Sequence, residues 1–234
     1  MYHRSPGEGG DVAALVSGGS DSAVLAVDLL RTFGRVWPIY ILFGLRWEEA
    51  ELSGLREFLD AVERPGLMPL TVLDEPVAEV YGDHWSTGGR GVPDAESPDE
   101  DVYLPGRTLL LAAKAAVWSG IRGIEALAIG TLASNPFPDS TPEFDRAFEA
   151  VVGGRFRLLR PFAGLEKADV LRRGTGLPLW LTFSCLDPVE GRHCGRCNKC
   201  AERRRGFGEQ GRADRTDYAA APVAPQRRPV PCTE

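Results

Sequence analysis

The segment Asp11–Ala23 constrains the fold more than any other part of the sequence. Its apolar residues end abruptly at Ser17-Gly18-Gly19-Ser20-Asp21-Ser22, and the residues after this run have the apolar spacing of a helix. The pattern predicts a strand, a tight loop and a helix start. At such a junction, backbone N–H groups and the positive end of the helix point to one spot, which favours an anion. Asp21 can cap the helix or hold a metal ion.

This loop differs from two common phosphate-binding motifs. It lacks the Gly-Lys-Ser/Thr ending of a Walker A loop, and its glycines do not have the spacing of the dinucleotide fingerprint. An ordinary strand–helix turn with a serine cap is the alternative that the local pattern allows. The run resembles the pyrophosphate loop (PP-loop) of the ATP pyrophosphatases, which cleave ATP between the α and β phosphates. That resemblance implies ATP binding by Ser17, Gly18, Gly19, Ser20, Asp21 and Ser22.

Length and composition limit the class of protein. A chain of 234 residues with 43% hydrophobic residues can form one α/β domain with an appendage. No apolar run reaches the roughly 20 residues of a membrane span, and the N-terminus lacks the apolar region of a signal peptide. We therefore expect a cytoplasmic protein without a membrane partner. The formal charge of -6 argues against broad contact with nucleic acid, and Arg203-Arg204-Arg205 is interpreted as a solvated helix end.

Strand and helix patterns alternate along the first two thirds of the chain. Strands are expected at 36–43, 67–73, 126–130 and 156–161, and helices at 48–61, 108–118, 143–152 and from 166 onward. This alternation predicts an α/β fold, a Rossmann-like parallel sheet with helices on both faces. On the helix at 108–118, the expected buried side consists of Leu109, Leu110, Ala112, Ala113 and Ala116. The segment 74–104 has no sustained period and is interpreted as a functional lid or a disordered stretch.

Four of the five cysteines lie close together, as Cys185, Cys194, Cys197 and Cys200. Four thiolates at this spacing are typical of a structural, tetrahedral Zn²⁺ site. An iron–sulfur cluster is the alternative, because Cys-x2-Cys-x2-Cys also opens a ferredoxin motif. Zinc is favoured because Arg204-Arg205 stands where that motif continues with cysteine and proline. The fifth cysteine, Cys232, has no partner in view.

These patterns divide the chain into three parts. Residues 1–180 are expected to form the ATP pyrophosphatase α/β domain, and residues 181–215 a zinc-binding module. The zinc segment has no obvious apolar core, so metal binding would supply much of its folding energy. Residues 216–234 are rich in Pro, Ala and Arg and are interpreted as a flexible tail.

Together, the loop and the cysteine cluster resemble the 7-cyano-7-deazaguanine synthases. These queuosine-pathway enzymes turn 7-carboxy-7-deazaguanine into a nitrile. The resemblance covers about residues 11–207. Besides the loop, it rests on these runs and single residues: Phe43-Gly44-Leu45-Arg46 with Glu51, Leu104-Pro105-Gly106-Arg107, Gly130, Phe137-Pro138-Asp139, Glu143-Phe144, Lys167, Thr182-Phe183-Ser184-Cys185 and His193-Cys194-Gly195-Arg196-Cys197-Asn198-Lys199-Cys200.

The resemblance implies an ATP-dependent carbon–nitrogen ligase that uses ammonia and forms adenylated intermediates. It implies ATP with Mg²⁺ as co-substrate and a structural Zn²⁺. It also implies catalytic roles for Asp21, Arg107 and Lys167, and contacts of Phe137 and Asp139 with the substrate base. For Arg107 and Lys167, ordinary surface charges are the alternative. The oligomeric state stays open, with a homodimer as one alternative.

Some residues depart from the usual pattern of that family. Thr108 stands where asparagine is usual, and Phe137 and Ser140 flank Pro-Asp where tyrosine and cysteine are usual. The loop from Gly130 to Asp139 is also shorter. A related enzyme that adenylates another carboxylate or amide, on a deazapurine, a protein or RNA, is therefore a second hypothesis. A non-catalytic nucleotide-binding module is a third, and the intact loop argues against it.

Overall fold

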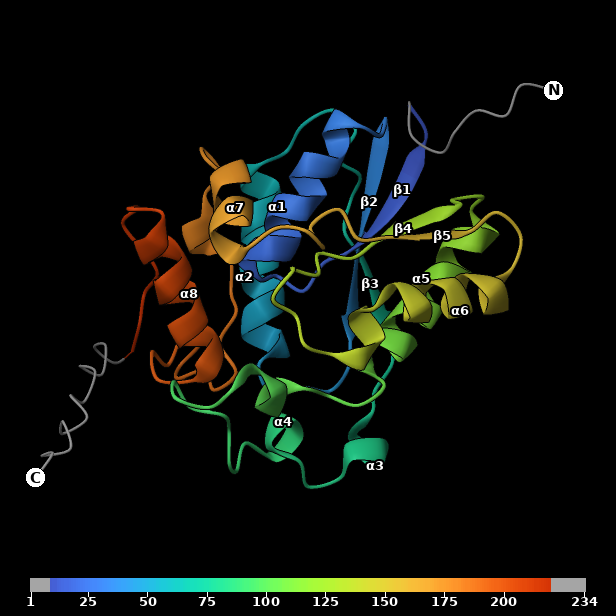
Figure 1. Ribbon diagram of the computed structural model, residues 1–234. Helices are drawn as coiled ribbons and strands as arrows, with labels where there is room; N and C mark the ends of the chain where they lie inside the picture. The colour runs from blue at the N-terminus through green and yellow to red at the C-terminus, as the bar shows by residue number, and fades with distance from the viewer. Residues whose placement is uncertain (1–8, 220–234) are drawn as a thin grey trace, which may run out of the picture.

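The computed structural model describes residues 9–219, and within them five strands form one sheet (Figure 1). The strands are β1 (Asp11–Leu15), β2 (Arg35–Leu42), β3 (Thr71–Asp74), β4 (Ala126–Ala128) and β5 (Arg157–Leu159). Their order is β3-β2-β1-β4-β5, and every pairing is parallel. The predicted α/β class with a Rossmann-like parallel sheet is confirmed. Because the strand order reverses between β1 and β4, a ligand crevice is expected at the carboxyl ends of these two strands.

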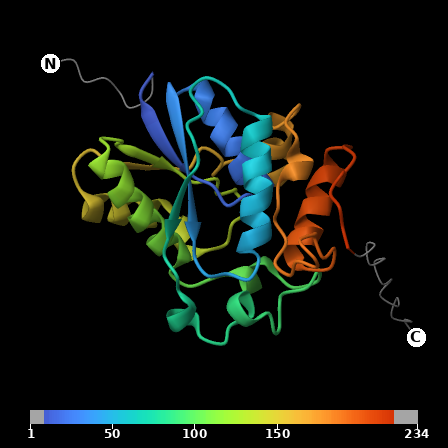
Figure 2. The ribbon, with the colours of Figure 1, turned by 180° about the vertical axis from the view of Figure 1, so that it is seen from behind.

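Helices cover both faces of this sheet (Figures 1 and 2). The core on one face contains residues of α1, α2 and α7, and the core on the other face contains residues of α5 and α6. The helices are α1 (Ser20–Asp28), α2 (Glu48–Ala61), α3 (Ala78–Tyr81), α4 (Trp85–Gly88), α5 (Arg107–Ile121), α6 (Pro142–Val152), α7 (Lys167–Arg173) and α8 (Asn198–Glu209). Short 3-10 turns are η1 (Leu29–Arg31), η2 (Asp99–Val102), η3 (Pro138–Ser140) and η4 (Leu179–Leu181).

The central strand β1 shows why the sheet is apolar on both sides. Val12 and Ala14 belong to the core under α1 and α2, whereas Ala13 belongs to the core under α5. Successive side chains of a strand point to opposite faces, so a strand covered on both faces has a continuous apolar run. The same burial fixes the position of the polar loop that begins at the end of β1.

A third apolar cluster lies beyond the carboxyl ends of the strands. It contains all four clustered cysteines together with Phe43, Trp47 and Phe183. The segment around the cysteines thus packs against residues that follow β2. In both views of the ribbon, the segment 74–104 with α3 and α4 lies at this same end of the molecule (Figures 1 and 2).

Two predictions about strand and helix positions need correction. The third strand begins at Thr71 and not at residue 67, because Pro69 has no N–H group to donate to a ladder. On α5, Leu109 is 48% exposed, whereas it was expected to be buried. The helix buries Ala112 and Ala116, as expected, together with Ala115 against the sheet, since small side chains let the helix lie close to the strands.

The arginine triplet was interpreted as a solvated helix end, but it lies inside α8, and of its three residues only Arg205 is exposed. Arg203 is only 1% exposed, and its guanidinium donates to the Oγ1 atoms of Thr216 (2.7 Å) and Thr182 (2.9 Å) and to the carbonyl oxygen of Leu179 (2.6 Å). These contacts compensate the cost of burying the charge. They also hold Thr216, the first residue of the predicted flexible tail, against α8. Residues 220–234 of that tail, including Cys232, lie outside the described residues.

Among residues 9–219, no helix combines the length and the apolar character that a membrane span requires.

Candidate active site and metal centre

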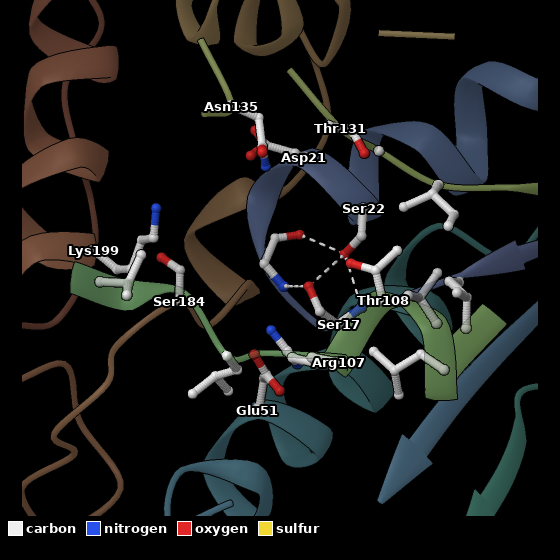
Figure 3. Close-up of a pocket in the computed structure, with 18 of the residues that line it drawn as sticks. Ser17, Asp21, Ser22, Glu51, Arg107, Thr108, Thr131, Asn135, Ser184 and Lys199 are labelled. Carbon is white, nitrogen blue, oxygen red and sulfur yellow. Dashed lines mark hydrogen bonds between the residues drawn. The ribbon is translucent and has the colours of Figure 1, made fainter. Parts of the chain in front are cut away.

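A pocket of about 330 Å³ opens where the carboxyl ends of β1, β2 and β4 meet (Figure 3). Several parts of the chain line it: the ends of β1 and β2, the loop 17–22, the start of α2, residues 102–111, the loop 129–140, Lys167 and residues 184–202. The strand-order reversal predicts a ligand site at this place. The pocket therefore gathers segments that are far apart in the sequence.

The loop after β1 has the geometry of an anion site. Ser17 donates its backbone N–H to Ser22 Oγ (3.0 Å), and Ser22 Oγ donates to the carbonyl oxygen of Gly19 (3.1 Å). Gly18 has a φ of +76°, and a Cβ there would lie 2.7 Å from the carbonyl oxygen of Glu51. Glycine is thus required at this position. No side chain caps the first turn of α1, so its N–H groups stay available to a phosphate.

One wall of the pocket carries a chain of alternating charges. Lys167 Nζ lies 2.8 Å from Asp21 Oδ2 and 3.1 Å from Glu202 Oε1, and Lys199 Nζ donates to Glu202 Oε2 at 2.6 Å. Burial lowers the pKa of Lys167, but Asp21 and Glu202 outweigh burial and the net pKa is raised. Lys167 is therefore a fixed positive charge next to the loop. From the sequence, Lys199 was expected only to offset the negative charge of the four thiolates, and Glu202 was given no role.

The opposite wall holds a buried acid and an arginine. Glu51 accepts a hydrogen bond from the Tyr40 hydroxyl at 2.8 Å, and the Nε atom of Arg107 has no hydrogen-bond partner among the described residues. Burial raises the pKa of Glu51 to about 8, against the opposing effects of Arg107 and Tyr40. Figure 3 shows the Glu51 and Arg107 side chains directed toward one another near Ser17. Glu51 is thus mostly neutral at pH 7, which leaves the charge of Arg107 available to an anionic ligand.

From the raised pKa of Glu51, we predict that the stability of the ligand-free protein falls as the pH rises from 4.5 to about 8. The folded state binds this proton more tightly than the unfolded chain, so unfolding releases it between these two pKa values. The stabilisation is complete below the lower value and is lost as the pH passes the upper one. The expected slope is up to about 1.4 kcal/mol per pH unit.

Denaturant titrations at several pH values would measure this slope as the difference between the wild-type protein and Glu51→Gln. The exposed Glu57→Gln on the same helix is the matched control and should give no such difference. A difference between wild type and Glu51→Gln that stays constant across this range would show that Glu51 is ionised in the folded state.

Asp139 is the least compensated charge of the pocket. It is 6% exposed, and neither of its carboxylate oxygens has a hydrogen-bond partner among the described residues. Beside it, the ring of Phe137 lies 5.0 Å from the ring of Tyr103, centroid to centroid. An unpaired buried carboxylate is costly unless a ligand supplies donors. The arrangement therefore suits a flat ligand with N–H groups along one edge.

The four clustered cysteines converge on one point. The sulfur atoms of Cys185 and Cys197 lie 3.9 Å apart, those of Cys194 and Cys200 lie 4.0 Å apart, and all four lie within 4.8 Å of one another. Tetrahedral bonds of about 2.3 Å to a single Zn²⁺ place the sulfurs about 3.8 Å apart. Several backbone N–H groups, among them those of Leu186 and Arg196, donate to these sulfurs and would stabilise thiolates. The group therefore fits one metal ion.

Most residues predicted for the site meet in this pocket. Those that line it are Ser17, Gly19, Ser20, Asp21, Ser22, Arg107, Phe137, Asp139 and Lys167, and Gly18 stands behind the loop. The segment 74–104 contains α3, α4 and η2, and its end lines the pocket through Val102, Tyr103 and Leu104. Five further residues line the pocket for which sequence reasoning gave no part in it: Glu48, Glu51, Ser184, Lys199 and Glu202. Glu51, Ser184 and Lys199 belong to the runs on which the family resemblance rests, which was the available signal.

Comparison with known proteins gives a consistent result. Residues 11–211 match the family model described as queuosine biosynthesis protein QueC. A 7-cyano-7-deazaguanine synthase of Myxococcus xanthus is 33% identical over 225 residues, which cover 87% of this chain and 95% of that protein. One of Anaeromyxobacter dehalogenans is 38% identical over 131 residues, covering 50% of this chain and 56% of that protein. Among solved structures, the U34-tRNA thiolase NcsA from Methanococcus maripaludis with its 4Fe-4S cluster has a TM-score of 0.49 and 12% identity, covering 86% of this chain and 65% of that one.

Proposed function

Because this chain belongs to the family of the queuosine biosynthesis protein QueC, we propose that it converts 7-carboxy-7-deazaguanine and ammonia into 7-cyano-7-deazaguanine with ATP. One observation carries the proposal: a phosphate loop, two cations and an unpaired carboxylate line the same pocket. The loop and cations suit ATP, and the carboxylate with its neighbouring aromatic rings suits a purine-like base. The reaction class is carbon–nitrogen ligation.

The first step forms an acyl-adenylate. An oxygen of the substrate carboxylate attacks the α phosphorus of ATP, the bond to the β phosphate breaks, and pyrophosphate leaves. The backbone and hydroxyls of the loop 17–22 hold the pyrophosphate, and Lys167 and Arg107 neutralise charge that develops on the phosphates. Mg²⁺ supplies further charge neutralisation when it is bound, and the carboxylate of Asp21 is its candidate protein ligand.

Ammonia then replaces AMP on the acyl carbon, and loss of a proton leaves the amide. The amide oxygen then attacks the α phosphorus of a second ATP, pyrophosphate leaves, and the amide nitrogen loses one proton. Departure of AMP together with the remaining N–H proton leaves the nitrile. Both adenylates react with water, so the pocket must exclude it. Residues 102–104, at the end of the segment 74–104, line the pocket and are placed to close over the bound base.

We assign Zn²⁺ to the four-cysteine group, as a structural ion with no open position. Sulfur atoms within 4.8 Å of one another leave room for one ion between them. The cysteine segment also supplies Ser184, Lys199 and Glu202 to the pocket. The ion thereby fixes one wall of the active site. In the proposed division of the chain, residues 181–215 are the part that depends on the metal.

Two measurements test this function together. Incubation with 7-carboxy-7-deazaguanine, ATP and ammonia should yield the nitrile by mass spectrometry. Calorimetry with a non-hydrolysable ATP analogue should show binding of the acid, and Asp139→Ala should weaken it at least about tenfold, since a buried polar partner is lost. Asp60→Ala, an exposed carboxylate on α2, is the control and should bind as the wild type does.

A related adenylating enzyme with another acceptor is the second candidate. One observation favours it: Thr108, Phe137 and Ser140, the residues that depart from the family's usual pattern, all line the pocket. A carboxylate or amide on a different deazapurine, a protein or an RNA would then take the place of the acid. Folded, metal-loaded protein that forms AMP with no detectable binding of 7-carboxy-7-deazaguanine would favour this candidate.

A further inference from the structure

We propose that Arg160 is a positioning residue that sets the base specificity of the pocket by holding the Asp139 loop in place before any ligand binds. The inference rests on the proposed function for the identity of the base. Arg160 lies just beyond β5, and its side chain is only 5% exposed. Neither the sequence motifs nor the resemblance assigned it a role.

Arg160 joins three segments through one guanidinium group. Its Nε contacts both carboxylate oxygens of Asp145 on α6, at 2.8 Å and 2.9 Å. Its Nη1 donates to Thr131 Oγ1 at 2.6 Å, and its Nη2 donates to the backbone carbonyl oxygen of Asp139 at 2.8 Å. The loop 129–140 that follows β4 is thus fixed at Thr131 and again at η3. Both of these contacts depend on the same planar guanidinium group.

The use of all three guanidinium nitrogens has a consequence for the pocket. Arg160 contacts the backbone of Asp139, while the Asp139 carboxylate stays without a hydrogen-bond partner among the described residues. Asp145 balances the arginine charge on the other side. Arg160 therefore holds the backbone of Asp139, and among the described residues no ion pair neutralises the Asp139 carboxylate. Its oxygens remain available to a ligand.

Such an arrangement favours a base edge with two adjacent donors. A carboxylate accepts two parallel N–H bonds well only when its orientation matches the edge. A carboxylate on a backbone that is already fixed loses less conformational freedom on binding, so the correct edge gains affinity. A displacement of about 1 Å can cost about 100-fold in a site of this kind. We therefore expect loss of Arg160 to reduce discrimination between base edges more than the chemistry at the phosphates.

The test compares two ligands that differ in one donor group. Calorimetry with a non-hydrolysable ATP analogue measures the binding of 7-carboxy-7-deazaguanine and of the analogue that lacks its exocyclic amine. The affinity ratio is the affinity for 7-carboxy-7-deazaguanine divided by the affinity for this analogue. Arg160→Met and Arg160→Lys should lower this ratio at least about tenfold, and Thr131→Val should lower it by a smaller factor. Exchange of labelled pyrophosphate into ATP should show a raised KM for the acid and a kcat within a fewfold of wild type.

Arg157→Met is the matched control. Arg157 on β5 pairs with Glu149 on α6 at 3.2 Å, so Arg157→Met removes a more exposed ion pair between this strand segment and α6. Among the described residues, the Arg157 side chain makes no hydrogen bond to the loop 129–140. Arg157→Met should keep the wild-type ratio. Hydrogen exchange on the ligand-free proteins adds a readout that needs no ligand. Backbone amides of residues 131–141 should exchange at least about tenfold faster in Arg160→Met and not in Arg157→Met.

The outcomes separate the two proposals. If the wild type binds neither base, the proposed function fails, and the exchange data still decide whether Arg160 holds the loop. If wild type and Arg160→Met discriminate equally, the positioning role is wrong. If Arg160→Met does not fold, Thr131→Val is the variant that tests the positioning role. If Thr131→Val discriminates between the two bases as the wild type does and shows wild-type hydrogen exchange in the loop, the inference is also overturned.

Discussion

The Asp21→Ala protein should lose AMP formation almost completely while it keeps its fold. Asp21 lies in the first turn of α1, faces the pocket and contacts Lys167 Nζ at 2.8 Å. Its removal leaves Lys167 held by Glu202 alone, 3.1 Å away, and removes the candidate ligand for Mg²⁺. Loss of a preorganised charge contact of this kind costs about 100- to 1,000-fold in rate. Ser17→Ala should act in the same direction through the loop.

The chain contains a matched control for this experiment. Asp28 ends the same helix and also binds a cation of α7, since Arg173 Nη1 lies 2.9 Å from its Oδ2. Asp28→Ala therefore removes an equivalent α1–α7 contact away from the pocket and should keep AMP formation. The rate of AMP release and the far-ultraviolet circular dichroism of both variants would be measured. Unchanged AMP release by folded Asp21→Ala would exclude Asp21 from the mechanism.

The parts of the site that the sequence predicted are built from neighbouring residues. The loop 17–22 closes through contacts such as the one between Ser17 and Ser22, five positions apart. The strand and helix around it follow from apolar periods that depend on local burial. The cysteines lie within a short stretch and share one chemistry. In these cases short-range sequence information is sufficient, because the structure that it specifies is itself short-range.

The parts that the sequence did not predict depend on tertiary packing. The family resemblance implied a role for Lys167, but its contact with Asp21, 146 positions away, was not predicted. Lys199 and Glu202 reach the pocket because α8 packs on α7. Arg203 had the charge of a surface residue, and its burial follows from Thr216 folding back onto α8. Leu109 was misplaced because α5 is rich in alanine. With small residues on several sides of the helix, hydrophobicity alone does not decide which side faces the sheet.

Replacement of Cys194 by serine should remove the metal and, with it, the binding of both substrates. Purified wild-type protein is expected to contain about one zinc per chain, because four thiolates complete a tetrahedral site. A structural zinc contributes about 10 kcal/mol or more of apparent binding energy in small domains. Its loss should therefore unfold the segment 183–200 locally. The core strands have their own apolar contacts and should stay folded.

The loss should reach the active site because the metal segment forms one of its walls. Ser184 and Cys185 line the pocket, and so does Lys199, one position before Cys200. Hydrogen exchange should show loss of protection at residues 183–200 and retained protection in β1 and β2. Calorimetry should show no binding of an ATP analogue. Cys232→Ser, a cysteine outside the cluster, is the control and should keep both metal and binding. Metal analysis that found stoichiometric iron with acid-labile sulfide would overturn the assignment of zinc. Wild-type nucleotide binding by metal-free Cys194→Ser would show that this wall of the pocket forms without the ion.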